Sequence, residues 1–175
     1  MAAELLTEHG DLKFIFVGDG SGKAQLLAQA EQKALPNVQF IPFQSRQRLP
    51  KVLASADIAL ITLKKGIGAE SLPYKTFSAL ASGRPVIASL DEGSETWNLI
   101  QRAQAGLCVP PENPEELVKA ILTLKGDPAL RERMGLNGRA WAEQHHSPQA
   151  AAEKIEQLLK VAITKQNFMS SRRNP

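Results

Sequence analysis

The chain has 175 residues, a mass of 19.0 kDa, 43% apolar and 22% charged residues, a formal charge of +3 and one cysteine. This composition is typical of a globular protein with one domain, and it excludes disordered and collagen-like classes. The lone Cys108 excludes an internal disulfide and a cysteine-based zinc site, and the small net charge does not favour a nucleic-acid partner.

Short apolar runs alternate with helical patterns through the first part of the chain, which predicts a Rossmann-like α/β fold with a parallel sheet of about five strands flanked by helices. The expected strands cover residues 14–17, 37–41, 58–61, 85–88 and 106–109. The expected helices cover residues 23–33, 49–56, 73–82 and 94–102. In the first of these helices, Ala24, Leu27, Ala28 and the neighbouring Leu26 are predicted to lie on the inner side, facing the sheet.

A helical C-terminal segment is predicted after residue 111, with three helices that each begin at a capping side chain followed by proline. The three caps are Asn113, Asp127 and Ser147. The stripes expected to be buried are Leu117, Ile121 and Leu124 in the first of the three and Ala151, Ile155, Leu158 and Ala162 in the last. Residues 1–166 are predicted to form a single domain, and residues 167–175 a disordered tail.

The loop Gly18–Lys23 lies between a predicted strand and a predicted helix, where backbone N–H groups can bind a phosphate. The dinucleotide fingerprint requires glycine where Lys23 stands, which disfavours a hydride-transfer enzyme. The P-loop motif requires glycine at Val17 and serine or threonine at Ala24, which disfavours a kinase. A tight turn without a ligand is the alternative interpretation of this loop.

A second candidate site is the segment 64–75, which combines three lysines, two glycines, Glu70 and a predicted helix N-terminus. Because it follows a parallel strand, it lies at the sheet edge where ligands bind. The helix N-terminus together with Lys75 would favour a diphosphate. A solvated basic loop is the alternative. None of the three histidines falls at this edge, so we expect no catalytic histidine.

Six short motifs occur in register along the chain. They are Gly18-Asp19-Gly20, Asn37 to Pro42, Ala56-Asp57-Ile58, Leu80 to Ala88, Gly106 to Pro110, and Met134-Gly135 with Arg139. In this order they resemble the C-terminal, nucleotide-sugar-binding domain of GT-B retaining glycosyltransferases of family 4 type, over about residues 12–160. The sequence Leu72-Pro73-Tyr74-Lys75 is similar to that of bacterial polysaccharide enzymes of the colanic-acid or fucosamine type.

The resemblance implies a donor site for a UDP-, GDP- or ADP-sugar, with no cofactor and no metal. Gly18 and Gly20 would border the donor cleft, and the backbone around Pro42 and Phe43 would face the nucleobase. The sugar and diphosphate would contact residues of the second candidate site. In that site, Glu70 would touch the transferred sugar as the catalytic residue and Ser78 would meet the ribose. The amides near Leu72 and Tyr74 would cradle the diphosphate, with Pro73 and Lys75 also among the donor-binding residues.

Two features depart from the family pattern. Ser78 stands where the family has a second glutamate, and a neutral hydroxyl binds a ribose diol more weakly than a carboxylate does. The family domain also opens with a Gly-Arg strand and a lysine that bind the diphosphate, whereas residues 1–9 here are predicted to be helical. We therefore expect the first family strand to be missing, with two strands on one side of the gap and three on the other.

These observations predict the donor-binding domain of a glycosyltransferase that transfers a sugar to a polysaccharide or lipid-linked acceptor. The isolated chain is expected to be inactive, because it lacks the arginine and lysine with which the family binds the diphosphate. The N-terminal acceptor-binding domain is expected as a missing partner. Self-association through the unpaired sheet edge is a further expectation. The alternatives are a non-catalytic interaction module and, less favoured, a sugar-nucleotide epimerase. The chain is expected to be cytoplasmic, and the full-length enzyme peripheral to the inner membrane.

Overall fold

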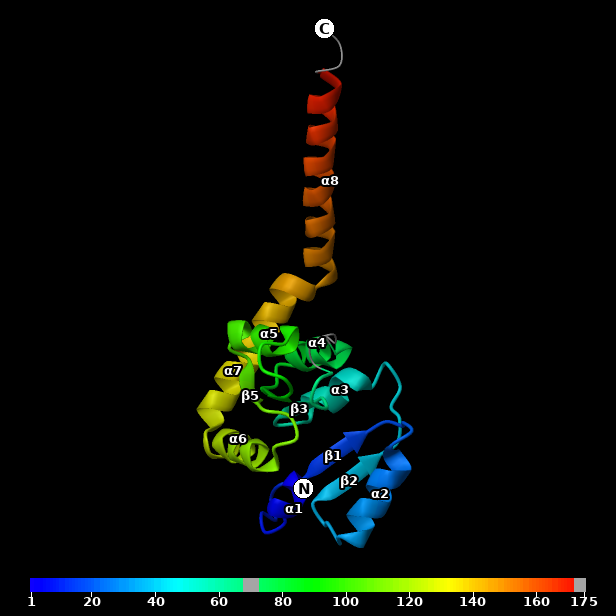
Figure 1. Cartoon of the computed structure of the whole chain (residues 1–175), viewed down its shortest axis with the longest axis vertical. Coiled ribbons are helices and arrows are strands. Elements are labelled where there is room, and N and C mark those ends of the chain that lie inside the picture. Colours follow the sequence, from blue (N-terminus) through cyan, green and yellow to red (C-terminus); the bar gives the residue numbers. More distant parts are fainter. Residues whose placement is uncertain (68–72, 172–175) are drawn as a thin grey trace.

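The computed structural model describes residues 1–67 and 73–171. Its helices and strands alternate along the first two thirds of the chain and are followed by helices alone (Figure 1). In chain order the elements are α1 Ala2–Leu5, β1 Phe14–Val17, α2 Lys23–Gln32, β2 Val38–Ile41, α3 Leu49–Ala54, β3 Ala59–Thr62, α4 Tyr74–Ala81, β4 Val86–Ser89, α5 Glu95–Ala103, β5 Gly106–Val109, α6 Pro114–Gly126, α7 Pro128–His146 and α8 Pro148–Ser171.

The five strands form two separate parallel sheets in the described part of the chain. β1 pairs with β2, with Phe14 opposite Val38, and β4 lies between β3 and β5, with Val86 opposite Ala59 and Gly106. The predicted α/β class with parallel strands and flanking helices is confirmed. The division into two strands and three strands is the one expected for a sheet that lacks a central strand.

The larger sheet carries most of the core. All four residues of β4 are buried, and α4, α5 and α7 contribute fully or nearly fully buried side chains such as Leu80 and Ile100. Gly135 of α7 lies so close to the Gly83 carbonyl that a Cβ atom there would be 2.2 Å from its oxygen. α7 therefore packs directly on the backbone at the end of α4.

α1 connects the two sheets. Leu6, just after α1, is fully buried in a cluster with Phe14 of β1 and Ile87 of β4. Asn37 Nδ2 donates to the Ala3 carbonyl at 2.7 Å, at the start of β2. The amino ends of both sheets therefore share one core.

Local signals for the C-terminal helices are confirmed. The side chains of Asn113, Asp127 and Ser147 accept hydrogen bonds from backbone N–H groups three residues later, at 3.0, 2.8 and 3.1 Å. Each cap satisfies a donor that the first helical turn leaves free. In α6 the predicted stripe is also confirmed, because Ile121 and Leu124 are buried.

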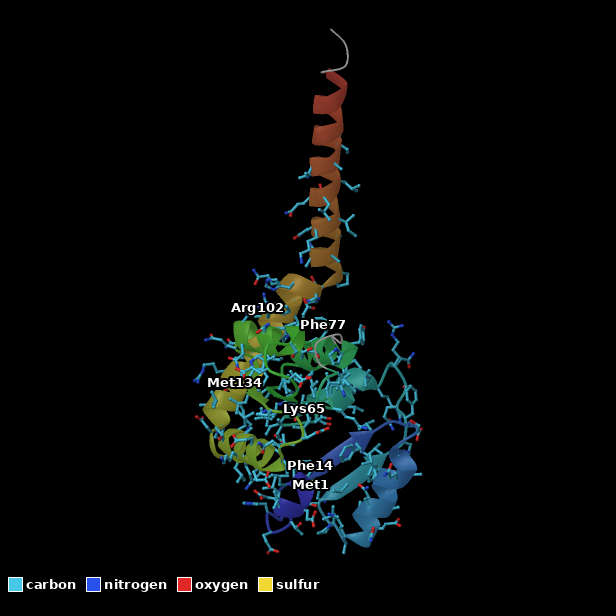
Figure 2. All side chains as sticks on the ribbon, in the orientation of Figure 1. Met1, Phe14, Lys65, Phe77, Arg102 and Met134 are labelled. Atoms are coloured by element: carbon cyan, nitrogen blue, oxygen red, sulfur yellow. The ribbon has the colours of Figure 1, made fainter. Side chains whose placement is uncertain are left out.

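Two helix faces predicted to be buried are not. α2 has no buried residue, and Leu26 beside its predicted inner face is 44% exposed. On α8, Ile155 and Leu158 are 59% and 70% exposed, and the helix projects away from the rest of the molecule with side chains on all sides (Figures 1 and 2). The stripe predictions were wrong here because amphipathicity identifies an apolar face but not whether another element covers it.

α8 also extends to Ser171, five residues into the segment 167–175 that was expected to be disordered. No glycine or proline interrupts the chain between Pro148 and Ser171, so the backbone can continue the helix without apolar periodicity. None of the described helices is both long enough and apolar enough to cross a membrane.

Candidate functional site

Two loops that follow neighbouring parallel strands meet at the carboxyl ends of β1 and β2. In open α/β sheets this is the edge at which ligands bind. A cleft of about 270 Å³ opens there. Its lining residues are Val17, Gly18, Phe43, Gln44, Arg46 and Leu49. The structure therefore brings together Gly18 and Phe43, two candidate residues that are 25 positions apart in the sequence.

Asp19 holds the glycine-rich loop against the loop that follows β2. Its Oδ1 accepts a hydrogen bond from Lys23 Nζ at 2.5 Å, and its carboxylate also accepts from the backbone of Phe43. The hydrogen bond and charge of Lys23 hold the pKa of Asp19 below its ordinary value. Gly18 has a φ of +124°, which other residues rarely adopt, so the turn into this loop depends on glycine.

The cleft presents an aromatic surface and a positive charge. The Phe43 side chain is 74% exposed at its rim, although a phenylalanine without a partner is normally buried. Arg46 contributes a guanidinium group to the lining. Gln44 Nε2 donates to the Pro42 carbonyl at 3.0 Å, which shapes the loop between the strand and Phe43. An aromatic face and a guanidinium group suit a ligand with a planar ring and an anionic group.

The start of α4 holds the second group of candidates. Pro73 is the N-cap residue and has no side-chain cap hydrogen bond, while its carbonyl accepts from the Thr76 N–H at 2.8 Å. Tyr74 is 82% exposed, Lys75 is exposed and Ser78 is half-buried. The exposed Tyr74 and Lys75 at the start of α4 are therefore accessible to an anion, whereas the Thr76 N–H is already hydrogen-bonded.

The segment between β3 and α4 is described only in part. The Gly66 N–H donates to Asp91 Oδ2 at 2.8 Å, which ties the start of this loop to the segment after β4. The predicted site residues Glu70 and Leu72 lie outside the described residues. Among the described residues, the lining of the cleft beside Gly18 includes none of the α4 candidates, whereas Gly20 and Pro42 belong to the two loops that form it.

Sequence reasoning missed Asp19, Arg46 and Asp91 as residues that organise this edge. Asp19 lies inside the glycine-rich loop, where the glycine spacing alone gives no role to its carboxylate. Arg46 lies in a basic loop directly after a predicted strand, which is the usual signal for a ligand-binding position. Asp91 follows the fourth strand in the same way.

A larger cleft, of about 330 Å³, lies at the opposite edge. Asp57, Arg84 and Arg131 line it, and Asp57 and Arg84 precede β3 and β4 in the chain. It therefore lies at the amino ends of these strands, where α/β sheets do not usually bind ligands. Arg131 is also engaged, because its Nη1 donates to the Leu124 and Lys125 carbonyls. We assign the smaller cleft as the candidate site.

No group of three or more histidine, cysteine, aspartate or glutamate side chains in residues 1–67 and 73–171 is arranged to hold a metal ion. Burial raises the pKa of the Cys108 thiol to about 11, so this side chain is protonated at neutral pH. Among the described residues, the cleft can bind an aromatic anion but presents no nucleophile.

The fold and the site define a Rossmann-like α/β protein with its ligand edge at the carboxyl ends of parallel strands. Comparison with known proteins gives the family. The chain belongs to the glycosyl transferases group 1 family, whose profile matches residues 1–141. The resemblance drawn from the sequence is confirmed.

Three relatives show how much of such a protein the chain represents. Escherichia coli WcaI, named for glycosyl transfer in colanic acid biosynthesis, is 36% identical over 126 residues, covering 69% of this chain and 31% of WcaI. Anabaena HepE, solved in complex with UDP, superposes with a TM-score of 0.77 at 22% identity, covering 91% of this chain and 44% of HepE. The C-terminal domain of LpcC, a group 1 protein from Francisella tularensis, gives a TM-score of 0.66 at 23% identity, covering 84% of this chain and 76% of that domain. The chain thus spans less than half the length of WcaI and HepE.

Proposed function

We propose that this chain is the part of a glycosyltransferase that binds the nucleoside diphosphate of a sugar donor. The observation that carries the proposal is the cleft in which Gly18 and Phe43 meet beside Arg46. The family membership supports it, and so does HepE, which was solved with UDP and with UDP-glucose. The ligand class that these complexes contain matches the aromatic and cationic lining of the cleft.

Recognition divides between the two candidate regions. The nucleobase lies against the exposed Phe43 ring, because stacking on an aromatic side chain contributes about 1–3 kcal/mol per base. Gly18 and Gly20 let the backbone approach the nucleotide. The diphosphate lies near the charges of Arg46 and Lys75 and accepts hydrogen bonds from the backbone amides near Leu72 and Tyr74, on either side of Pro73.

We place the sugar and the ribose of the donor near Glu70 and Ser78. Glu70 accepts hydrogen bonds from hydroxyl groups of the transferred sugar, and the Ser78 hydroxyl meets the ribose. Since Ser78 is neutral, its contact with a ribose diol is weaker than that of a charged carboxylate. We expect donor affinity to depend mainly on the base and the diphosphate.

In the intact enzyme, the bond between the sugar and the donor diphosphate breaks and a bond to an acceptor hydroxyl oxygen forms, with retention of configuration. The acceptor proton leaves with the diphosphate, whose negative charge the basic groups stabilise. The acceptor is a growing polysaccharide or a lipid-linked sugar, held by the part of the enzyme that this chain does not contain. We place the enzyme in the cytoplasm, peripheral to the inner membrane, and expect the isolated chain to be inactive.

Calorimetric titration with UDP, GDP and ADP, with and without EDTA, tests donor binding. We expect one nucleotide to bind best and EDTA to have no effect. Arg46→Ala should weaken binding about tenfold, which corresponds to about 1.4 kcal/mol for a lost charge-assisted contact. Phe43→Ala should weaken binding by a similar factor.

Arg102→Ala is the matched control, because Arg102 is an exposed arginine on α5, far from Phe14 and β1 (Figure 2). Equal affinity for the three nucleotides, or no binding of any of them, would overturn the proposal and favour a non-catalytic interaction module. Sugar transfer by the isolated chain would contradict the expected inactivity.

A further inference from the structure

The larger cleft, at the amino ends of β3 and β4, contains charged side chains of both signs. Its volume of about 330 Å³ lies within the range of small-ligand sites, roughly 300–1,000 Å³. The guanidinium groups of Arg84 and Arg131 and the carboxylates of Asp57 and Glu132 line it. In the described part of the chain, no ion pair engages any of these four side chains. Their charges therefore remain available to a ligand.

Backbone carbonyl groups hold both guanidinium groups in place. Arg84 Nη2 donates to the Ala54 carbonyl at the end of α3. Arg131 Nη1 donates to the Leu124 and Lys125 carbonyls, at 2.6 and 2.9 Å, in the last turn of α6. Each guanidinium group has five N–H donors, so most of them remain free after these contacts. Because the two groups are already oriented, they lose less side-chain entropy when they bind an anion.

The positive charge of Arg84 is only partly compensated. Its Nε is buried and has no hydrogen-bond partner in the described structure, and a buried donor left unsatisfied costs about 1–3 kcal/mol. The guanidinium charge is delocalised over three nitrogens, so an anion that binds at Nη1 offsets the charge of the whole group. This uncompensated charge favours an anionic ligand in the cleft.

The order of the helices adds a helix N-terminus to the same cleft. A helix that follows a parallel strand begins at the carboxyl edge of the sheet, as α6 does after β5. α7 instead follows α6, with only Asp127 between them, so it begins at the amino edge, where Pro128 lines the cleft. The positive end of the α7 dipole contributes about 0.3–1 kcal/mol to the binding of an anion at an exposed site. The amino edge thereby gains positive groups that open sheets usually present at the carboxyl edge.

The walls of the cleft are fixed to one another. A Cβ atom at Gly135 of α7 would lie 2.2 Å from the carbonyl oxygen of Gly83, so α7 packs directly on the loop that carries Gly83 and Arg84. Pro85, the next residue of that loop, is buried and also lines the cleft. The site is therefore formed before a ligand binds, which lowers the entropic cost of binding.

We propose that the larger cleft is a second ligand site that binds a small sugar phosphate. The phosphate lies between Arg84 and Arg131, whose planar groups match its oxygens. Hydroxyl groups of the sugar donate to the carboxylates of Asp57 and Glu132. This site is separate from the nucleotide cleft and does not depend on the proposed donor binding.

Other anions fit the lining less well. None of the described residues that line the larger cleft is aromatic, so a nucleobase has no ring to stack on. Inorganic phosphate offers few donors to the two carboxylates. An amino acid offers an ammonium group to the carboxylates, but its single negative charge matches two guanidinium groups less well than the dianion of a phosphate monoester does.

The probe is glucose 6-phosphate, titrated into the full chain without nucleotide and followed by NMR. We expect saturable shifts of the backbone amides of Gly83, Arg84 and residues 129–132, larger than any at Gly18. Inorganic phosphate should bind about tenfold more weakly, because it lacks the hydroxyl contacts. Glucose alone should leave these amides unchanged.

Two variants test the two halves of the site. Arg131→Gln should weaken binding of glucose 6-phosphate about tenfold, because a charge-assisted contact is lost. Arg133→Gln is the matched control, because Arg133 is an exposed arginine of α7 that does not line the cleft. Glu132→Ala should reduce the preference for glucose 6-phosphate over phosphate about threefold, since one acceptor for the sugar is lost. Glu132 is exposed and supports neither guanidinium group, so this variant decides the question even if Arg131→Gln does not fold.

Shifts at the larger cleft that depend on Arg131, together with a preference for the sugar phosphate that depends on Glu132, support the proposal. No binding, equal affinity for phosphate and glucose 6-phosphate, tighter binding of the amino acid glycine, or shifts only beside Gly18 would overturn it. Because no nucleotide is present, these outcomes are independent of the titration that tests donor binding.

Discussion

The two sheets of this molecule differ in how completely they are packed. All four residues of β4 are buried, and α4 and α5 each place three or more residues in the interior. In the two-stranded sheet, Phe14 is the one buried residue of β1, and the neighbouring helix α2 has no buried residue. The three-stranded sheet provides most of the buried core, whereas the two-stranded sheet carries the candidate nucleotide cleft and a free strand edge. The candidate ligand-binding residues thus lie in the part of the fold that buries the fewest of its own side chains.

The largest expected effect is a difference in unfolding free energy between Ile→Ala variants at the second residue of two strands, β4 and β1. Ile87→Ala in β4 should destabilise the chain by about 2–5 kcal/mol, because the side chain is fully buried. Ile15→Ala in β1 should cost less than about 1 kcal/mol, since Ile15 is already 54% exposed. Urea unfolding of both variants measures the difference. Equal losses of unfolding free energy in the two variants would show that β1 is packed as tightly as β4.

A smaller effect is expected from packing of backbone against backbone. Gly135→Ala places a Cβ atom 2.2 Å from the Gly83 carbonyl oxygen, so α7 must shift from α4, at a cost of about 1–3 kcal/mol. Gly126→Ala is the matched control, because nothing lies within 4 Å of its added Cβ. Thermal unfolding should show a lower Tm for the first variant and little change for the second. An unchanged Tm in both would contradict the close approach.

The end of α7 predicts a modest pH dependence. Burial against Phe77, whose ring centroid lies 4.0 Å from that of His146, lowers the pKa of His146, with smaller contributions from Lys154 and His145. The unfolded chain therefore binds this proton more readily than the folded chain. This contribution to stability is present above pH 6.5 and is lost as the pH falls below it. We expect Tm to depend less on pH between pH 7.5 and 5.5 in His146→Gln than in the unchanged chain. Identical pH profiles of Tm in the two proteins would contradict a lowered pKa of His146.

The smallest effect is expected on α8. Leu158→Ala should change the free energy of unfolding by less than about 0.5 kcal/mol, because Leu158 is 70% exposed and the helix projects from the rest of the molecule (Figure 1). The same substitution at the fully buried Leu124 of α6 is the comparison. A large loss at Leu158 in chemical denaturation would mean that α8 is covered in solution.

Local signals in the sequence predicted local structure well. The strands begin and end within one residue of their predicted bounds, because short apolar runs flanked by polar, glycine or proline residues leave little choice of strand ends. The helix caps at Asn113, Asp127 and Ser147 depend only on residues within one turn. The wrongly predicted faces of α2 and α8 depend instead on what other elements are present, which an amphipathic pattern does not contain.

The candidate site divides in the same way. Consecutive strands that pair in parallel bring the loops after them to the same edge of the sheet. The sequence was therefore sufficient to place Gly18 and Phe43 at one edge. The role of Asp19 depends on a contact with Lys23 and the Phe43 backbone, which requires the folded loop. Arg46 could have been found from its position after a strand. Glu70 and Leu72 remain predictions.

Hydrogen exchange measured by mass spectrometry, with and without the nucleotide that binds best, tests the central claim most directly. The account predicts slower exchange in the segments 18–23 and 42–48 and no change in β4. Protection that appears instead beside Arg84 and Arg131, or no change at either cleft, would contradict the assignment of the nucleotide site.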